Sequence, residues 1–254
     1  MKNWKEFCQV KRFLLNGREI PAVSLGTSPF IGAGQFRSKA ADYYKKFYQN
    51  PQNMEEIIIK SVKLGIPAIQ AIAYEGIIQT IKNVREKLQI NLFSSITIGF
   101  HDWRKELEES KVIDPQIAFI FPSITDLRNK AKLKEVIDAV KEAGVIPGCA
   151  THNPIKTLPF LEDSGLDIKV YLAPINPEGK FMGSEPAKVL ELYEKAKKPV
   201  IGKKVLAAGD IGPEEAFPFV SKIENIKGIT VGITSIQEAE ETFEQARKFW
   251  PIEG

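Results

Sequence analysis

Short apolar segments alternate with longer amphipathic segments along most of the chain. Eight of the short segments are rich in β-branched and other apolar residues and have the length of a buried strand. They are AVSLGT (22–27), IPAIQAIA (66–73), LFSSITIG (92–99), QIAFIFP (116–122), VIPGCAT (145–151), DIKVYLAP (167–174), PVIGKKVLA (199–207) and GITVGIT (228–234). Near-continuous apolar strands of this kind are typical of a parallel sheet covered by helices.

A segment with apolar residues at helical spacing follows each predicted strand. These helices are predicted over 54–65, 76–88, 103–111, 132–144, 154–165, 185–198, 213–224 and 236–250. Strict alternation of strand and helix indicates a parallel sheet with helical crossovers. Eight such units in 254 residues predict a (β/α)8 TIM barrel. A doubly wound open sheet is the alternative, but it usually contains fewer repeats.

Two segments fall outside the repeat. Residues 11–20, KRFLLNGREI, predict a β-hairpin with Asn16 and Gly17 in the turn, and we expect it to close the N-terminal end of the barrel. Residues 34–53 form an insertion after the first strand that is rich in aromatic residues and lysine. Long loops at that end of a barrel often form lids, and the alternative is a surface helix whose tyrosines pack on the barrel. No linker divides the chain, so we expect one domain over residues 1–254.

Composition narrows the class of protein. The net charge is +3 and both signs are interspersed, which gives no basic footprint for nucleic acid but leaves room for small anionic ligands. The two cysteines, Cys8 and Cys149, lie far apart and form neither a metal-binding nor a redox motif. We expect a cytoplasmic protein, because the chain has no signal peptide and no run of eighteen apolar residues. Heavy use of isoleucine and lysine hints at a thermophilic source. The sequence does not indicate an oligomeric state.

Several motifs, in their order along the chain, resemble those of the aldo/keto reductase superfamily. VSLGTSPFIG resembles the family's opening VSxLGLGT, and KLGIPAIQAIAYEG stands where the family has GINxFDTAxxYG. VIPGCATHNP resembles GxSTHxP, and LDIKVYLAPINPEGKFMG resembles the strand-six region of the same branch. PVIGKKVLAAGDIGPEEAFPFV resembles VIGMKVLGxGxxxPEEALRFV, and VGITSIQEAEETFEQA resembles IGxSSPEQLEENL. The resemblance implies the family's barrel fold for nearly the whole chain.

The family's catalytic residues are only partly present. The family reduces carbonyls with NADPH through an Asp, a Tyr, a Lys and a His at the C-terminal ends of strands two to four. Here the Asp, Lys and His positions read Gln70, Thr97 and Pro122, and Tyr74 falls about one residue short of the Tyr position. A tyrosine needs a cation or another partner to act as an acid at neutral pH. Tyr74 is therefore predicted to be a remnant or a ligand contact rather than a reductase acid.

Polar residues gather at the predicted C-terminal ends of the strands, where a barrel of this type keeps its active face. They are Thr27, Ser28, Gln70, Tyr74, His101, Asp102, Ser123, Thr151, His152, Asn153, Asn176, Lys204, Thr234 and Ser235. The two histidines are interpreted either as a general base and its partner or metal ligands, or as neighbours of the helix caps Asp102 and Asn153. A metal needs a third ligand, for which Asp126 or Asn176 is possible, but no motif supports either of them, so no metal site is predicted.

Lys203 and Lys204 interrupt an apolar strand, so alternation predicts that one of them faces the barrel interior. Lys204 matches the lysine of the family's MKVLG, and we expect it to point inward with its ammonium near His152. Its possible roles are an anion clamp or an amine nucleophile, and the alternative is a buried ion pair.

Two loops at the seventh and eighth strands put small residues before a helix start, which attracts phosphate. In the family these loops hold the phosphates of NADPH. The residues that the resemblance assigns to such a cofactor are Gly26, Thr27, Gly209, Thr234, Ser235 and Glu241. The basic residue that often binds the 2′-phosphate has no counterpart in TSIQEAEE, and Ser235 could simply cap the last helix.

The leading hypothesis is a divergent aldo/keto-reductase-like barrel without standard carbonyl reductase activity. It would bind NADP(H) or a phosphorylated small molecule at the corner of the seventh and eighth strands. Two alternatives stay open. One is a lyase- or isomerase-type enzyme that uses Lys204 and His152, and the other is a non-catalytic binding protein on the same scaffold. The expected partner is a small molecule rather than a nucleic acid or a membrane.

Overall fold

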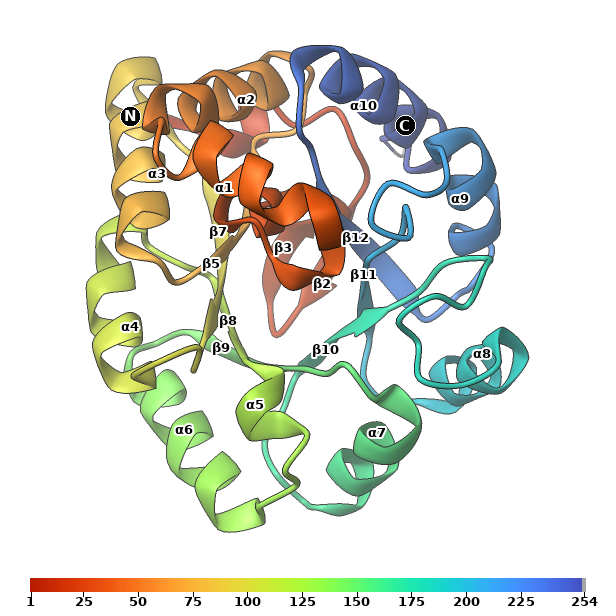
Figure 1. Ribbon diagram of the computed structural model, residues 1–254. Helices are drawn as coiled ribbons and strands as arrows, with labels where there is room; N and C mark the ends of the chain where they lie inside the picture. Colours follow the sequence, from red (N-terminus) through yellow and green to blue (C-terminus); the bar gives the residue numbers. More distant parts are fainter. Residues whose placement is uncertain (253–254) are drawn as a thin grey trace.

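Eight parallel strands close into a barrel in the computed structural model, which describes residues 1–252 (Figure 1). The strands follow one another around the barrel in chain order, and the last pairs with the first. They are β4 (Val23–Gly26), β5 (Ala68–Ile72), β7 (Phe93–Ile98), β8 (Ile117–Ile120), β9 (Ile146–Ala150), β10 (Val170–Pro174), β11 (Val200–Lys203) and β12 (Ile226–Gly232). This closed parallel sheet confirms the predicted TIM barrel.

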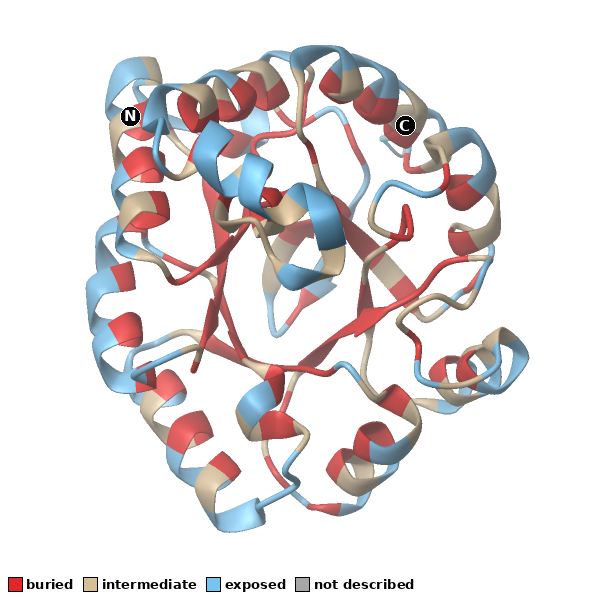
Figure 2. Cartoon of the chain, viewed as in Figure 1, coloured by how far each residue is buried: buried red, intermediate tan, exposed pale blue. Residues whose placement is uncertain are grey.

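Helices surround the barrel and turn their apolar sides toward it (Figures 1 and 2). They are α2 (Pro51–Lys63), α3 (Glu75–Leu88), α4 (Trp103–Ser110), α5 (Pro122–Thr125), α6 (Lys130–Glu142), α7 (Pro154–Asp163), α8 (Pro186–Lys195), α9 (Pro213–Val220) and α10 (Ile236–Phe249). In α2, Met54, Ile57, Ile58 and Val62 are buried, which is the spacing of one helix face. The short helix α5 was not predicted, because Pro122, expected to end a strand, instead begins a helical turn.

Strand β11 is shorter than predicted. It ends at Lys203, whereas the apolar pattern extended to residue 207. Lys204, Ala207 and Ala208 have φ angles of 56°, 48° and 65°, so the backbone leaves the extended conformation directly after the strand. The chain therefore turns away at the mouth of the barrel, and Lys204 stands in a loop rather than in the sheet.

A hairpin lies across the N-terminal end of the barrel. Strands β2 (Arg12–Leu15) and β3 (Arg18–Pro21) pair antiparallel, and Asn16 and Gly17 between them both have positive φ, as a type I′ turn requires. Arg18 donates to the side chain of Gln116 and to the carbonyl of Gly144, both of which precede barrel strands. A separate small sheet is the parallel pair of β1 (Lys2–Asn3) and β6 (Ile90–Asn91).

The insertion after β4 covers the opposite end, the mouth of the barrel (Figure 1). It consists of η2 (Ser28–Ile31), η3 (Gly34–Lys39) and α1 (Ala40–Phe47), and we call residues 28–47 the cover. The rings of Phe30 and Phe47 pack 5.0 Å apart and are fully buried. Lys46 Nζ donates to the carbonyl of Thr234 over 2.7 Å and so fastens the cover to the loop before α10.

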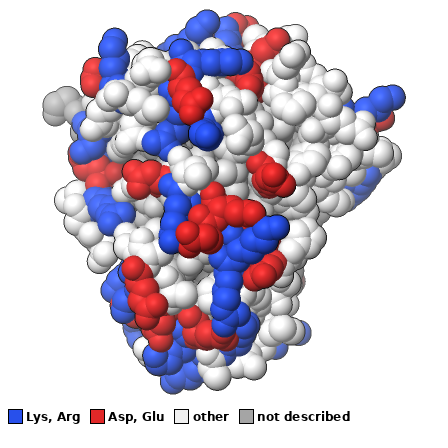
Figure 3. All heavy atoms as spheres, turned by 90° about the vertical axis from the view of Figure 1, so that its left-hand side faces the viewer, with Lys and Arg blue, Asp and Glu red and all other residues white. Residues whose placement is uncertain are grey.

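Acidic and basic side chains intermingle on the face formed by the helices at the left of Figure 1, which is turned to the viewer in Figure 3. Several are paired along or between helices, such as Lys105 with Glu109 and Arg104 with Glu135. Within residues 1–252 no helix is both long enough and apolar enough to cross a membrane.

Candidate functional site

A cavity of about 330 Å³ opens at the mouth of the barrel, beneath the cover. Strand ends from most of the barrel line it, and Gln35, Phe36 and Tyr43 of the cover close it from above. Its volume lies at the lower end of the range of small-molecule sites, about 300 to 1,000 Å³. The cover is thus both a helix that packs on the barrel and one wall of a site.

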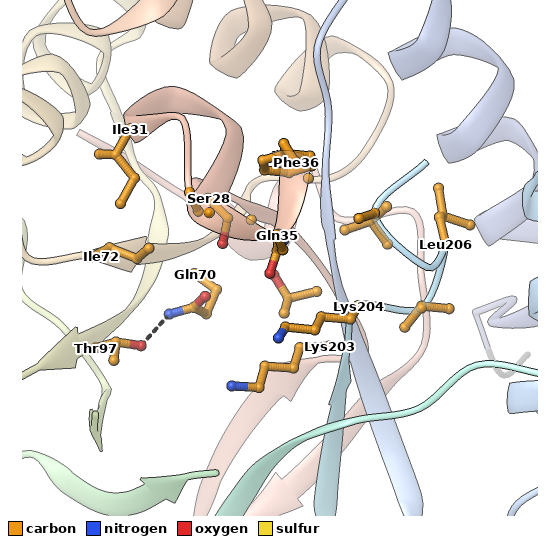
Figure 4. A pocket seen from close by; sticks show the side chains of 18 of the residues that line it. Ser28, Ile31, Gln35, Phe36, Gln70, Ile72, Thr97, Lys203, Lys204 and Leu206 are labelled. Carbon is orange, nitrogen blue, oxygen red and sulfur yellow. Dashed lines mark hydrogen bonds between the residues drawn. The ribbon is translucent and has the colours of Figure 1, made fainter. Parts of the chain in front are cut away.

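Gln70 and Thr97 form a neutral pair on one wall of this cavity (Figure 4). Gln70 Nε2 donates to Thr97 Oγ1 over 2.8 Å and to the carbonyl of Ala71 over 3.0 Å. Both side chains come from adjacent strands, β5 and β7, and are at least nine-tenths buried. Because Thr97 accepts from the amide, its own hydroxyl proton is free to donate into the cavity.

Tyr74 does not line the cavity. It stands at the start of α3, and its ring lies in an aromatic cluster, 5.9 Å from the ring of Tyr48, 5.3 Å from Phe100 and 5.7 Å from His101. Burial raises the pKa of its hydroxyl, and Tyr48 and Glu106 raise it further. The cluster holds the ring beside the mouth, and the raised pKa makes the hydroxyl a weaker acid than an ordinary tyrosine. A ligand contact at Tyr74 stays a prediction.

Lys203 and Lys204 both point into the cavity, side by side (Figure 4). Lys203 is the last residue of β11, and its backbone is held opposite Pro174 of β10. Lys204 follows with φ of 56°, which breaks the alternation of side chains and brings it to the same side. The expectation that Lys204 alone faces inward is therefore wrong, since Lys203 enters the cavity as well.

Neither lysine forms an ion pair or a hydrogen bond through its ammonium with another residue of the described chain. The ammonium of Lys204 lies 4.8 Å from the ring centroid of Phe181. Burial lowers the pKa of Lys203 to about 7, the charge of Lys204 adds to this, and Asp126 opposes it. Burial also lowers the pKa of Lys204 to about 8. Two amines of weakened basicity therefore share one site.

His152 stands on the rim of the same cavity, in the loop between β9 and α7. Desolvation lowers the pKa of its imidazole well below 6.5, and the charges of Lys203 and then Lys204 lower it further. Part of the residue is in contact with solvent, which limits the desolvation, but all three causes favour a neutral imidazole at pH 7. The expected influence of Lys204 on His152 is present, and Lys203 shares in it.

Asp126 holds the loop that carries His152. Its carboxylate accepts from Thr151 Oγ1 over 2.5 Å, from the His152 backbone N–H over 3.0 Å and from Thr157 Oγ1 over 2.8 Å. Asn153 occupies the N-cap position of α7, as the capping interpretation expected, but its side chain makes no capping hydrogen bond. The carboxylate of Asp126 instead orders the residues before this helix.

His101 belongs to a different part of the mouth. Phe100 and Phe121 link the two imidazoles in a chain of ring contacts, and His101 does not line the cavity. Asp102 caps α4 by accepting from the backbone N–H of Arg104 over 3.1 Å, as the capping interpretation expected. The histidines are not a base and its partner. In the part of the chain that the structure describes, no three His, Cys, Asp or Glu side chains are grouped to bind a metal.

At the corner of β11 and β12 a carboxylate of the protein itself engages the start of α10. Glu238 accepts from the backbone N–H of Thr234 over 2.7 Å and from its hydroxyl over 2.6 Å. Ser235 caps α10 by accepting from the Glu238 N–H over 3.1 Å. The pattern S-x-x-E in SIQE is a helix-start signature, so the sequence did contain a signal for this arrangement.

The six residues assigned to a cofactor by resemblance divide into two groups. Gly26, Gly209 and Thr234 line the cavity. Thr27 is fully buried and accepts from the Ile72 N–H over 2.9 Å, Ser235 is a helix cap, and Glu241 pairs with Gln237 on the exposed side of α10. The second group therefore has structural roles.

Thr230 of β12 belongs to the wall of the cavity. The residue is 6% exposed, and its hydroxyl is enclosed and has no hydrogen-bond partner in the described chain. A Cβ at Gly26 would lie only 2.9 Å from this hydroxyl, so the absence of a side chain at Gly26 makes room for Thr230. The hydroxyl is therefore packed against β4 and is a buried polar group without a partner.

Comparisons with solved structures place the barrel among known folds. A proposed aldo-keto reductase from Pseudomonas aeruginosa superimposes with a TM-score of 0.69 at 16% identity, covering 94% of this chain and 95% of that one. The chain has the fold of the aldo-keto reductases. An aldo-keto reductase from a Medee basin deep-sea metagenome library gives 0.61 at 15% identity, covering 94% of both chains. An aldo-keto reductase from Klebsiella pneumoniae, in complex with NADPH, gives 0.61 at 12% identity, covering 93% of this chain and 89% of that one.

No known family profile matches the sequence, and no curated protein matches it. Because the similar structures share only 12 to 16% of their residues with this chain, the likeness to aldo-keto reductases shows a shared fold and does not extend to activity. What the site does must therefore be argued from its own side chains.

Proposed function

We propose that the chain is a divergent member of the aldo/keto reductase superfamily that binds a small anionic molecule between Lys203 and Lys204. The observation that carries the proposal is the entry of both ammonium groups into one cavity without a carboxylate paired to either in residues 1–252. The ligand is a carboxylate or phosphate compound small enough for a cavity of about 330 Å³.

The energetics of the lysine pair support this assignment. Two cations in a partly buried, mostly apolar mouth repel each other and lose hydration, which costs stability. Proteins keep such destabilising groups mainly where function needs them. An anion between the two amines would offset both costs, and the Thr97 hydroxyl, whose proton is not used within the described chain, would supply a hydrogen bond to one of its oxygen atoms.

Tyrosine-dependent carbonyl reduction is not part of this proposal. The Asp and Lys positions of the family carry the neutral pair Gln70 and Thr97, and the His position carries Pro122. Tyr74 lies outside the cavity with a raised pKa. Without a cation beside it, such a tyrosine is a poor proton donor at pH 7.

A nicotinamide cofactor is implied by the fold, and one similar structure contains NADPH. The corner that the resemblance assigns to its phosphates does not fit them here, because the Glu238 carboxylate already occupies the Thr234 N–H at the start of α10. Residues 236–245 of α10 include four glutamates and no Lys or Arg, so a phosphate there would meet negative charge. We therefore place the anion site at the lysine pair instead of this corner.

Thermal unfolding with inorganic phosphate tests the proposal. Phosphate should raise the Tm of the wild type and of a Lys130→Met control, which removes an exposed lysine at the start of α6. The rise should be lost or strongly reduced in Lys203→Met and Lys204→Met, because each lacks one of the two cations. Equal rises in all four proteins would overturn the proposal.

A further inference from the structure

Lys203 is the more rigidly placed of the two lysines. It ends a barrel strand whose neighbours β10 and β12 pair with it on both sides, and its carbonyl accepts from the Ile175 N–H over 3.0 Å. Lys204 stands in the loop that follows. Reactive groups on strands are held more exactly in position than groups on loops.

The amine of Lys203 faces a polar wall. Figure 4 shows its nitrogen directed across the mouth toward the side occupied by Gln70 and Thr97. There the Thr97 hydroxyl has a proton to donate, and the side-chain oxygen of Gln70 makes no hydrogen bond within the described chain. A tetrahedral carbon bonded to the Lys203 nitrogen could therefore carry a hydroxyl that accepts a hydrogen bond from Thr97 Oγ1 and donates one to the side-chain oxygen of Gln70.

The charged and titratable groups around Lys203 favour its neutral form. Lys204 and His152 face the same cavity, and Asp126 and Glu238 are the nearby carboxylates. Asp126 is engaged by the loop of His152, and Glu238 by Thr234. Burial and the charge of Lys204 outweigh Asp126 and lower the pKa of Lys203 to about 7, which favours the free amine far more than in an exposed lysine.

We infer that Lys203 is an amine nucleophile that forms a Schiff base with a small carbonyl compound, and that Lys204 holds an anionic group of the same compound. This inference rests on the proposed anion site. The substrate class is a short oxo acid or a phosphorylated aldehyde or ketone, which joins a carbonyl to an anion within one small molecule.

The step balances without a further reactant. The nitrogen lone pair of Lys203 attacks the carbonyl carbon, a C–N bond forms, and the carbonyl π electrons move to oxygen. A proton passes from nitrogen to that oxygen to give a carbinolamine, to which Thr97 can donate a hydrogen bond. The carbinolamine oxygen then takes a second proton from solvent, the C–O bond breaks and water leaves, and the nitrogen lone pair forms the C=N bond of a protonated Schiff base.

Reductive trapping with pyruvate and cyanoborohydride at pH 7, read by peptide mass mapping, tests the inference. An ordinary lysine has a pKa of about 10.4 and is almost wholly protonated at pH 7, so Lys203 should be labelled on the order of a hundredfold faster than exposed lysines. In Lys204→Met the label should stay on Lys203 but need more pyruvate, and in Lys130→Met it should equal the wild type. Labels spread evenly over surface lysines, without preference for Lys203, would overturn the inference.

Lactate separates this inference from the proposed anion site, because it has the carboxylate but not the carbonyl. If phosphate and lactate raise the Tm through the lysines while pyruvate leaves no label on Lys203, the anion site stands and the Schiff base is refuted. If neither anion acts through the lysines, the anion site fails as well. The Lys203→Met variant should melt cooperatively and lose the fast label, and Lys203→Arg, which keeps the charge, should lose it too.

Discussion

The side-chain amide of Gln70 donates a hydrogen bond to the hydroxyl of Thr97, with 2.8 Å between Nε2 and Oγ1. The sequence resemblance aligns these two residues with the aspartate and lysine of the aldo/keto reductase motif. On that alignment a neutral hydrogen bond stands in place of two charged groups, and it cannot lower the pKa of a tyrosine. The cations of this site come instead from the opposite wall, at Lys203 and Lys204.

The first prediction concerns reductase activity. Assays with NADPH and a panel of aldehydes should give turnover well below about 1 per second, the low end of ordinary enzyme rates. Tyr74→Phe should behave as the wild type in these assays, because the Tyr74 hydroxyl lies outside the cavity. Turnover at ordinary rates that Tyr74→Phe abolishes would contradict this part of the account.

The second prediction concerns stability and pH. The pKa of Lys203 is about 7 in the folded protein against 10.5 in the unfolded chain, so the unfolded state binds more protons between these values. Below pH 7 the lysine is charged in both the folded and the unfolded state, so the full free-energy cost of burying the ammonium lowers stability. Above about pH 10.5 the amine is neutral in both states, and this cost disappears. Lys203→Met should therefore raise the free energy of unfolding by about 1 to 3 kcal/mol at pH 6 to 7, after discounting for partial solvent contact.

Urea unfolding across this pH range measures the effect. The gain in free energy of unfolding that Lys203→Met shows over the wild type should shrink as pH rises from 7 toward 10. The exposed control Lys130→Met should differ from the wild type by less than about 0.5 kcal/mol at every pH. If Lys203→Met lowers the free energy of unfolding, or if its gain over the wild type grows with pH, then burial of the Lys203 ammonium does not destabilise the folded protein.

The third prediction concerns the cover over the mouth. Gly32 has φ of 57°, and a Cβ there would overlap the carbonyl oxygen of Ala40 at the start of α1. Gly32→Ala should lower the free energy of unfolding by about 2 to 3 kcal/mol, through backbone strain and displacement of the cover. Gly34→Ala is the matched control, because a Cβ at Gly34 meets no atom within 4 Å. Equal stability of the two variants would mean that the cover is not packed as described.

Much of the fold could be predicted because it follows from apolar periodicity. Each barrel strand overlaps a predicted apolar segment, and the turn at Asn16 and Gly17 follows from residues that accept positive φ. The early end of β11 could not be predicted, because Lys204 and Ala207 adopt positive φ without being glycine. Such conformations are imposed by the surrounding structure and leave no pattern in the sequence.

The site could be predicted only in part for the same reason. Polar residues at strand ends indicated the correct face, and His152 and Lys204 do lie in the cavity. The direction of Lys203 depends on where β11 ends. Alternation along the longer predicted strand allowed only one inward lysine, and the family motif selected Lys204, so the inward direction of Lys203 was missed. The partnerless hydroxyl of Thr230 depends on packing around it, which no local pattern encodes.

A crystal soaked with selenate and measured at the selenium edge tests the central claim, that the lysine pair is the binding centre. Selenate has the shape and charge of a small tetrahedral anion, and anomalous scattering locates it without ambiguity. The account predicts a peak between the amines of Lys203 and Lys204 that disappears in Lys203→Met crystals. A peak at the start of α10 beside Thr234, with none at the two lysines, would contradict it.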